Sequence, residues 1–272
     1  VRISAPAVDR TIESCRSITA PGQYEIVGDI RSSSDRSCLR VQVSNVTIDG
    51  GEYAIEGAGP VDDLGVDEAN AGVLVDGVTE ERIENVTVRN LSANGWNAGV
   101  QVHVSGLGGP TDVRIENVTA RGNDVGLSLR GGTMNVTNVT TENNRAGIDL
   151  ATAGPTTVAD ATVRNNDIGV GAVELASGVL RNATVRDNAD GGVLTSAAVS
   201  LRVENTTVSD NGGFGVRLQG DAGSALADVT VTNNTGPGVE VLSSRGTSSI
   251  DRSVIANNGG VGVRVDANVP TT

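Results

Sequence analysis

The sequence predicts an all-β fold, a single-stranded right-handed parallel β-helix with rungs of about 21–24 residues and an N-terminal cap. Three observations carry this prediction. A short phrase recurs seven times from about residue 114 onward, its apolar and polar residues alternate with a period of two, and no stretch has helical periodicity. Parallel strands joined by crossovers in one sheet should coil right-handed.

An asparagine marks each copy of the phrase, and a glycine follows it three or four residues later. Asparagines at one position of successive rungs can form a ladder of side-chain hydrogen bonds along the rod, so we expect a structural role for them. The seven are Asn123, Asn144, Asn166, Asn188, Asn211, Asn234 and Asn258.

Short strands fill the rest of each phrase. Ala161–Arg164 and Gly215–Leu218 alternate apolar and polar residues, as a strand with one buried face does. A leucine-rich repeat has the same length, but the regular leucines that it needs are absent. Two or three short strands with tight turns therefore make one rung.

The earlier chain fits the same pattern with irregular spacing. Asn45, Asn85 and Asn117 are each followed by a Val-Thr strand start. We align them with later rungs at Asn138, Asp160, Asn182, Asn205 and Asp228. The long gaps between them predict loops that bulge out near 56–71 and 92–112.

One continuous domain is expected. Residues 1–40 form the N-terminal cap and first coil, 41–268 the rungs, and 269–272 a C-terminal tail. Nine rungs can be anchored, which at about 4.8 Å each makes a rod of about 40–45 Å.

The composition is acidic and free of lysine. All 20 cationic residues are arginines, against 33 acidic ones, so the net charge is −13. Such a chain resembles the proteins of salt-loving archaea, in which strong salt screens the repulsion between carboxylates. An ordinary acidic surface encoded by a GC-rich genome is the alternative. The negative charge disfavours nucleic acid as a partner.

Cys15 and Cys38 are the only cysteines and lie 23 residues apart, about one rung. We expect a disulfide between the cap and the first coil, and hence an oxidising compartment; two buried free thiols are the alternative. No run of 18 apolar residues predicts a transmembrane segment. The chain begins at Val1 without Met, as a processed or excised fragment would. An extracellular or cell-surface location is predicted.

The N-terminal residues carry a resemblance to a known family. Ser14-Cys15-Arg16-Ser17-Ile18, Pro21-Gly22-Gln23-Tyr24, Gly28-Asp29-Ile30, Cys38-Leu39 and Asn45-Val46-Thr47-Ile48-Asp49-Gly50 resemble the opening of NosD-type, pectate-lyase-like β-helix proteins, which is common in secreted haloarchaeal surface proteins. The match covers the first 57 residues in motif detail. The superfamily includes polysaccharide lyases, glycosidases, epimerases, tailspikes, adhesins and a protein linked to copper-site maturation, so the resemblance implies a fold rather than an activity.

Nine asparagines precede X-Ser/Thr and predict N-glycosylation. They are Asn45, Asn85, Asn90, Asn117, Asn135, Asn138, Asn182, Asn205 and Asn233. Six of them fall at the strand-opening position aligned above, where Asn suits the turn and Thr the strand, so much of the count is a by-product of the repeat.

The irregular rungs hold the rarest residues. Trp96 is the only tryptophan and His103 the only histidine, and Gln101 points outward two residues before His103. Trp96 could stack on a sugar ring or cover a turn. Arg89 and Arg121 follow the outward-facing Thr87 and Thr119 by two residues and could contribute a basic stripe for an anionic glycan, or pair with neighbouring acids.

An acidic loop completes the candidate region. Asp62, Asp63, Asp67 and Glu68 could bind Ca²⁺ through oxygen, or form a solvated loop. No other cofactor is predicted.

Catalytic signals are weak. The outward residues after the rung glycines, Gln101, Ser128, Asp149, Gly171, Leu194 and Arg217, contain no acid cluster of the kind that glycosidases need. One His103 and one Met134 do not make a copper site. We therefore predict a non-catalytic extracellular module that is structural, adhesive or glycan-contacting, with cell-surface components or polysaccharide as partners and self-association open. The alternative is a polysaccharide lyase or glycoside hydrolase with a groove near 56–112.

Overall fold

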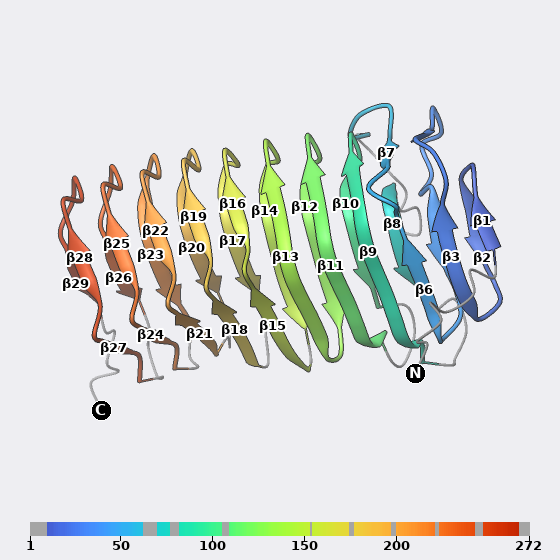
Figure 1. Cartoon of the computed structure of the whole chain (residues 1–272). Coiled ribbons are helices and arrows are strands. Elements are labelled where there is room, and N and C mark those ends of the chain that lie inside the picture. Colours follow the sequence, from blue (N-terminus) through green and yellow to red (C-terminus); the bar gives the residue numbers. More distant parts are fainter. Residues whose placement is uncertain are drawn as a thin grey trace, which may run out of the picture.

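The computed structural model describes residues 10–61, 70–76, 82–104, 109–152, 154–173, 177–196, 200–220, 223–242 and 247–266. The described chain contains strands and no helix, and every strand pairing is parallel. The strands coil into one rod, from the first coils at β1 and β2 to the last at β28 and β29 (Figure 1). The predicted right-handed parallel β-helix is confirmed.

The rod has three faces, which we number in the order in which the chain meets them in each coil. Face 3 is an 11-stranded sheet whose strands follow the sequence without a break in order. Its strands are β2 (Arg16–Ile18), β5 (Leu39–Val41), β8 (Ala71–Asp76), β10 (Ala98–His103), β12 (Val125–Gly131), β14 (Ala146–Thr152), β17 (Ile168–Val173), β20 (Gly191–Ser196), β23 (Phe214–Gln219), β26 (Val239–Leu242) and β29 (Val263–Val265).

Faces 1 and 2 belong to one 18-stranded sheet that bends along its length. Three long strands, β9 (Glu84–Asn94), β11 (Thr111–Arg121) and β13 (Met134–Glu142), run through both faces. Face 1 also contains β1 (Arg10–Ile12), β3 (Gly22–Ile26), β6 (Val46–Asp49), β15 (Pro155–Ala159), β18 (Ser177–Arg181), β21 (Leu201–Glu204), β24 (Ala225–Ala227) and β27 (Ser249–Asp251). Face 2 also contains β4 (Ile30–Arg31), β7 (Ala54–Glu56), β16 (Thr162–Arg164), β19 (Thr184–Arg186), β22 (Thr207–Ser209), β25 (Thr230–Thr232) and β28 (Val254–Ala256).

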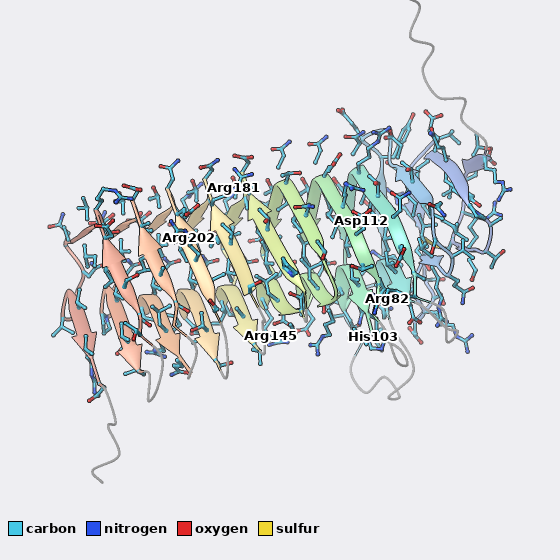
Figure 2. All side chains as sticks on the ribbon, turned by 90° about the horizontal axis from the view of Figure 1, so that it is seen from below. Arg82, His103, Asp112, Arg145, Arg181 and Arg202 are labelled. Atoms are coloured by element: carbon cyan, nitrogen blue, oxygen red, sulfur yellow. A yellow bond between two sulfur atoms is a disulfide. The ribbon has the colours of Figure 1, made fainter. Side chains whose placement is uncertain are left out.

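The side chains on opposite sides of the rod can be followed in Figure 2. Arg181 and Arg202, on face 1, project from one side, and His103, on face 3, lies on the other. The two sides therefore present separate outer surfaces to solvent.

The corner between faces 1 and 2 is made by residues with positive φ. Asn90, Asn117 and Asn138 adopt φ of 55°, 53° and 52°. Asn and Asp tolerate this left-handed conformation better than other residues with a side chain. Asn117 donates from Nδ2 to Oδ1 of Asn90 at 2.9 Å, and Asn138 does the same to Asn117 at 3.2 Å. The corner is thus an exposed asparagine row that continues through Asp160, Asn182, Asn205 and Asp228.

The register corrects the alignment of the early asparagines. Val46 pairs with Val86, and Val86 pairs with Val113, so Asn45 and Asn85 open face 1 together with Asp112. Asn90, and not Asn85, is equivalent to Asn117. The sequence alone misaligned them because both corners require a left-handed residue before an apolar strand residue, and Asn-Val satisfies both.

The predicted loop near 92–112 was a consequence of that misalignment and is largely wrong. Strand β9 continues to Asn94 and β10 spans Ala98–His103, so residues 92–103 form ordinary parts of a coil. The bulge expected near 56–71 falls mostly on 62–69, which lie outside the described residues.

The buried asparagine ladder is confirmed, and it runs through the interior of the corner between faces 2 and 3. Asn188 is fully buried. Its backbone N–H and Nδ2 donate to Oδ1 of Asn211 at 3.0 and 2.9 Å, and Nδ2 also donates to the carbonyl of Val163 at 3.4 Å. Its own Oδ1 accepts the same pair of bonds from Asn166. Every polar atom of this buried amide is therefore satisfied.

The glycines of the phrase are required by this packing. A Cβ on Gly126 would lie 2.5 Å from the carbonyl oxygen of Gly147 and 3.1 Å from Nδ2 of Asn144. No side chain fits there, because the ladder holds successive backbones too close together. The Asn-to-Gly spacing in the sequence is thus a steric requirement of the ladder.

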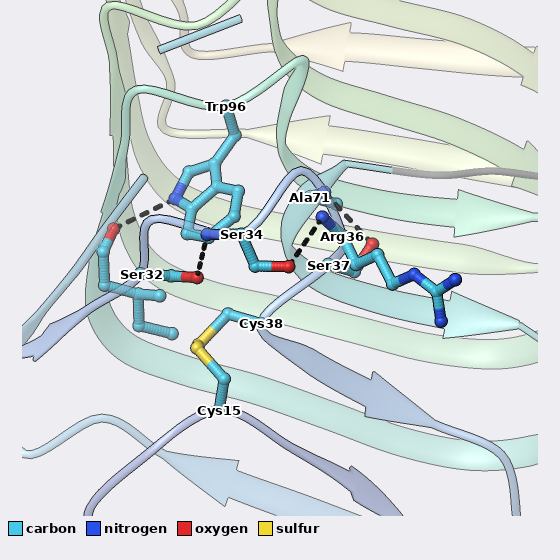
Figure 3. Close-up of a disulfide and its surroundings, with 9 residues drawn as sticks. Cys15, Ser32, Ser34, Arg36, Ser37, Cys38, Ala71 and Trp96 are labelled. Atoms are coloured by element: carbon cyan, nitrogen blue, oxygen red, sulfur yellow. Dashed lines mark hydrogen bonds between the residues drawn. A yellow bond between two sulfur atoms is a disulfide. The ribbon is translucent and has the colours of Figure 1, made fainter. Parts of the chain in front are cut away.

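The cysteines form the predicted disulfide. Cys15 and Cys38 are joined, and they tie the turn before β2 to the turn before β5 (Figure 3). Ile12 and Ile18, in the first two strands, are fully buried. The N-terminal end of the rod is therefore both covered and cross-linked.

We predict that Asn188→Ala destabilises the rod strongly. The change leaves donors of Asn166 and the carbonyl of Val163 buried without partners, at about 1–3 kcal/mol for each such group, so we expect a loss of about 3 kcal/mol. Chemical denaturation monitored by circular dichroism measures it. Asn135→Ala is the matched control, because Asn135 is exposed and stands outside the ladder; equal losses in the two variants would contradict a special role for the ladder.

We predict that losing the disulfide loosens the N-terminal coils first. Closing a loop of this size stabilises a fold by about 3 kcal/mol, and solenoid rungs depend chiefly on their neighbours. The single Trp96 lies in the fourth coil and reports on this end by fluorescence. In the Cys15→Ser, Cys38→Ser variant its emission should shift at a lower temperature than the loss of the circular dichroism signal. Coincident transitions would argue that the rod unfolds as one unit.

Candidate functional site

Trp96 is not a sugar-stacking residue, which corrects the first of the predicted ligand contacts. The side chain is fully buried, and Nε1 donates to the carbonyl of Ile55 at 3.1 Å (Figure 3). Its backbone N–H donates to Oδ1 of Asn123 at 2.9 Å, so Trp96 stands at the head of the buried asparagine ladder. The indole fills the coil where an asparagine would otherwise lie, and no ring face is left for a ligand.

Arg89 and Arg121 do not share a stripe, nor do they lie near His103. Arg89 is on face 1, where Nε contacts Oδ2 of Asp49 at 2.9 Å. Arg121 is on face 2, where Nε contacts Oε1 of Glu142 at 2.6 Å. Glu142 also holds Arg164. The alternative interpretation, pairing with neighbouring acids, therefore describes both arginines.

The Asp49 carboxylate is held in its charged form. Burial by itself raises the pKa of Asp49, but hydrogen bonds from Asn90 and from the backbone of Gly51, together with the charge of Arg89, outweigh it and lower the pKa below its ordinary value. Arg89 therefore binds the same carboxylate as Asn90, which stands at the corner between faces 1 and 2.

Gln101 and His103 do lie together with other polar side chains, on the outer surface of face 3. Gln101 pairs in register with Leu74 and Ser128, and His103 pairs with Asp76. We define the His103 patch as seven residues of five neighbouring strands: Arg40, Asp76, Gln101, His103, Ser128, Arg130 and Asp149.

One end of the patch is a partly buried ion pair beside the histidine. Nη2 of Arg40 contacts Oδ2 of Asp76 at 2.5 Å, and the Asp76 side chain is only 7% exposed. His103 lies beside Asp76 on the next coil, partly exposed, and its Nδ1 is buried without a hydrogen-bond partner. A buried polar atom without a hydrogen-bond partner is rare in folded proteins.

The other end of the patch offers an exposed cation. Val102 pairs with Leu129, so Arg130 follows on β12 as His103 follows on β10. The guanidinium of Arg130 is half exposed, and Nη2 contacts Oδ2 of Asp149 at 3.2 Å. Between the two ends lie the half-buried Gln101 and the buried Ser128. The patch therefore combines amide, imidazole and guanidinium groups in a row across adjacent coils.

The patch is local, because the next coils of face 3 carry small or uncharged residues. The position of Gln101 is occupied by Gly171 and Leu194 in β17 and β20, and charge returns only at Arg217 in β23. The predicted outward row after the rung glycines is confirmed by this register. Nε of Arg217 then contacts Oε2 of Glu240 in the next coil at 2.6 Å.

The donor set suits recognition of a hydroxyl-rich or anionic ligand better than glycoside hydrolysis. Arginine and amide groups bind carboxylates and hydroxyls through several hydrogen bonds. Glycosidases require one carboxyl as a free acid and a second as a base or nucleophile. Asp76 and Asp149 are each held by an arginine, so neither is placed as a free acid.

The predicted Ca²⁺ ligands Asp62, Asp63, Asp67 and Glu68 lie outside the described residues. Elsewhere in the described chain, no group of three or more His, Cys, Asp or Glu residues is arranged to hold a metal ion. Across the same residues there is also no helix that is long and apolar enough to cross a bilayer.

The sequon asparagines have structural partners in most cases. Nδ2 of Asn85, Asn117, Asn138, Asn182 and Asn205 each donates to a side-chain oxygen of the preceding coil, and Nδ2 of Asn90 donates to Asp49. Asn135 and Asn233 are exposed. Modification of any of the nine remains a prediction.

Comparison with known proteins places the chain in a family. Residues 100–255 match the model of the right handed beta helix region, which is more than half of the 272 residues. The chain belongs to this family of right-handed β-helix proteins. No curated protein matches it.

Solved structures of varied activity share the fold. The A-module of a mannuronan C-5 epimerase from Azotobacter vinelandii matches with a TM-score of 0.55 and 14% identity, over 92% of this chain and 90% of that one. The catalytic unit of a thermostable α-1,3-glucanase from Streptomyces thermodiastaticus has a TM-score of 0.53 and 16% identity, over 93% and 64%. A surface adhesin of Streptococcus pneumoniae has a TM-score of 0.53 and 12% identity, over 90% and 62%. At these identities the likeness extends to the fold alone.

Sequence reasoning missed Arg40, Asp76 and Arg130 as neighbours of His103. Their distances from it along the chain are irregular, since the coil between β5 and β8 is longer than the coil between β10 and β12. The signal that could have found Asp76 and Arg130 is the outward position two residues after Gln101, taken in each coil. Arg40 occupies the position of Gln101 itself.

Proposed function

We propose that this protein is a non-catalytic, polysaccharide-contacting β-helix of the extracellular surface, and that the His103 patch is its contact surface. The observation that carries the proposal is the row formed by the partly exposed His103, the half-buried Gln101 and the half-exposed Arg130 on adjacent coils. In the next two coils of face 3 the position of Gln101 is occupied by Gly171 and Leu194. The described groups offer hydrogen bonds that a sugar hydroxyl or carboxylate could complete.

The disulfide and the shared fold support an extracellular location. A disulfide is stable outside the cytosol, and the fold is shared with proteins whose names describe a mannuronan epimerase, a glucanase and a surface adhesin. A flat outer face made of parallel strands can follow a linear polymer over several coils, which suits glycan contact.

The test is binding to an array of uronic, sulfated and neutral polysaccharides. We expect the intact chain to bind an acidic polysaccharide, and Arg130→Ala and His103→Ala to weaken the Kd about 10- to 100-fold, as the loss of a hydrogen bond to a charged group does. Arg181→Ala is the matched control, because Arg181 is an exposed arginine on face 1, opposite the patch (Figure 2). Equal weakening by all three would mean non-specific attraction, and no binding at all would leave a purely structural role.

A second candidate is a polysaccharide lyase that uses His103 as a base, with Arg130 facing the carboxylate of a uronic acid. The specific observation in its favour is the partly exposed imidazole of His103, which lies one coil away from the half-exposed guanidinium of Arg130. A lyase leaves an unsaturated sugar that absorbs in the ultraviolet, so incubation with the polysaccharide that binds separates the two. We expect no absorbance and no chain shortening; a signal abolished in His103→Ala would make the protein an enzyme.

We also propose that the protein is halophilic and comes from a secreted NosD-type surface protein of a salt-loving archaeon. The net charge of −13 without a single lysine supports this. Salt screens repulsion between surface carboxylates, so the melting temperature should rise from low to multimolar KCl. Equal melting temperatures in both would contradict halophily.

A further inference from the structure

The nine N-glycosylation sequons share one feature in the folded chain, which is that the middle residue of each is buried. None of these middle residues is more than 3% exposed. They are Val46, Val86, Leu91, Val118, Val136, Val139, Ala183, Thr206 and Asn234. Each sequon therefore passes through the wall of the rod, with its asparagine on the outer side and the next residue buried.

The backbone of the sequons is engaged as well. A transferase must hold the asparagine amide and the hydroxyl two residues later at the same time, so the backbone between them enters its active site too. In the rod, Val118 pairs with Leu91 on one side and Val139 on the other. The backbone N–H of Asn234 donates to Oδ1 of Asn258 at 3.0 Å. The closed coils thus keep these sequons from a transferase.

The nine asparagines differ in whether the nitrogen that would carry the sugar is free. Six of them donate from Nδ2 to a side-chain oxygen of the preceding coil, at 2.9 to 3.2 Å; they are Asn85, Asn90, Asn117, Asn138, Asn182 and Asn205. The other three, Asn45, Asn135 and Asn233, are exposed. Within the described chain, Nδ2 of these three has no hydrogen-bond partner.

A sugar on one of the six bonded asparagines would disturb the contacts between coils. Linkage to Nδ2 replaces one of its hydrogens with a sugar ring, and the neighbouring coil lies only about 4.8 Å away. The bond from Asn138 to Asn117 would then have to open or bend. Asn135 is exposed on β13, and Asn233 stands at the corner before the buried Asn234, so a glycan on either extends into solvent without breaking a bond.

We propose that this chain receives N-linked glycan before its coils close, and that Asn45, Asn135 and Asn233 are the positions that carry it in the folded rod. The donor would be an oligosaccharide on a lipid phosphate. Transfer forms a bond from Nδ2 to the anomeric carbon and breaks the bond from that carbon to a phosphate oxygen, so the lipid phosphate leaves and the amide loses one proton. The inference rests on the extracellular location proposed above, and it does not depend on polysaccharide binding.

Secretion of the full 272-residue chain from a host that glycosylates Asn-X-Ser/Thr tests the positions. Peptide mass spectrometry of the secreted, folded protein should find glycan on Asn45, Asn135 and Asn233 and on none of the other six asparagines. Thr235→Ala should remove the glycan of Asn233 and leave the circular dichroism unchanged. Thr207→Ala is the matched control, because Thr207 is also an exposed sequon threonine, and its loss should leave the glycan pattern unchanged.

The timing is tested with folded chain that was made without glycan. We expect a purified oligosaccharyltransferase with its lipid-linked donor to modify synthetic peptides that span the sequons and to leave the folded chain unmodified. Equal transfer to peptides and folded chain would overturn the timing, and glycan on any of the six bonded asparagines of the secreted rod would overturn the choice of positions. A secreted chain without glycan would overturn the proposal as a whole. The polysaccharide array gives a separate readout, so the two proposals fail independently.

Discussion

The buried asparagine ladder is the interaction on which the rest of the structure depends. Each ladder amide accepts two hydrogen bonds from one neighbouring coil and donates to the other, so the coils are held at one spacing throughout that corner. The close approach of backbones that results excludes any side chain at the glycine of each phrase. The turn, the glycine and the following strand are all consequences of satisfying a polar group inside an apolar core.

The ladder also explains why the core can be narrow and almost free of aromatic residues. Val, Ile and Leu stacked on their equivalents in adjacent coils fill the interior, and the single tryptophan is accommodated only where the ladder begins. Trp96 therefore has a packing role, and its rarity in the sequence was a misleading guide to function. Trp96 occurs once in the chain because it occupies the position at which the asparagine ladder begins.

The three faces of the rod use the charged and polar residues of their outer surfaces differently. Faces 1 and 2 use their charged residues in pairs between coils, as Arg89 does with Asp49 and Arg121 with Glu142. Face 3 also pairs charges between coils, but near its N-terminal end the His103 patch adds imidazole and amide groups to them. Nδ1 of His103 and Nε of Arg40 are both buried there without a hydrogen-bond partner.

The sequence by itself determined the fold, the ladder, the glycine positions and the disulfide partners. These follow from local chemistry that recurs at each coil, and with only two cysteines one pairing is available. It could not determine which early residues share a column, because two corners use the same Asn-Val chemistry and the coil lengths vary from 40 to 27 residues there. Only the tertiary structure decided that Trp96 is buried, that Arg89 and Arg121 lie on separate faces, and that Arg40, Asp76 and Arg130 surround His103. Register sets those neighbours, and register is a property of the assembled coils.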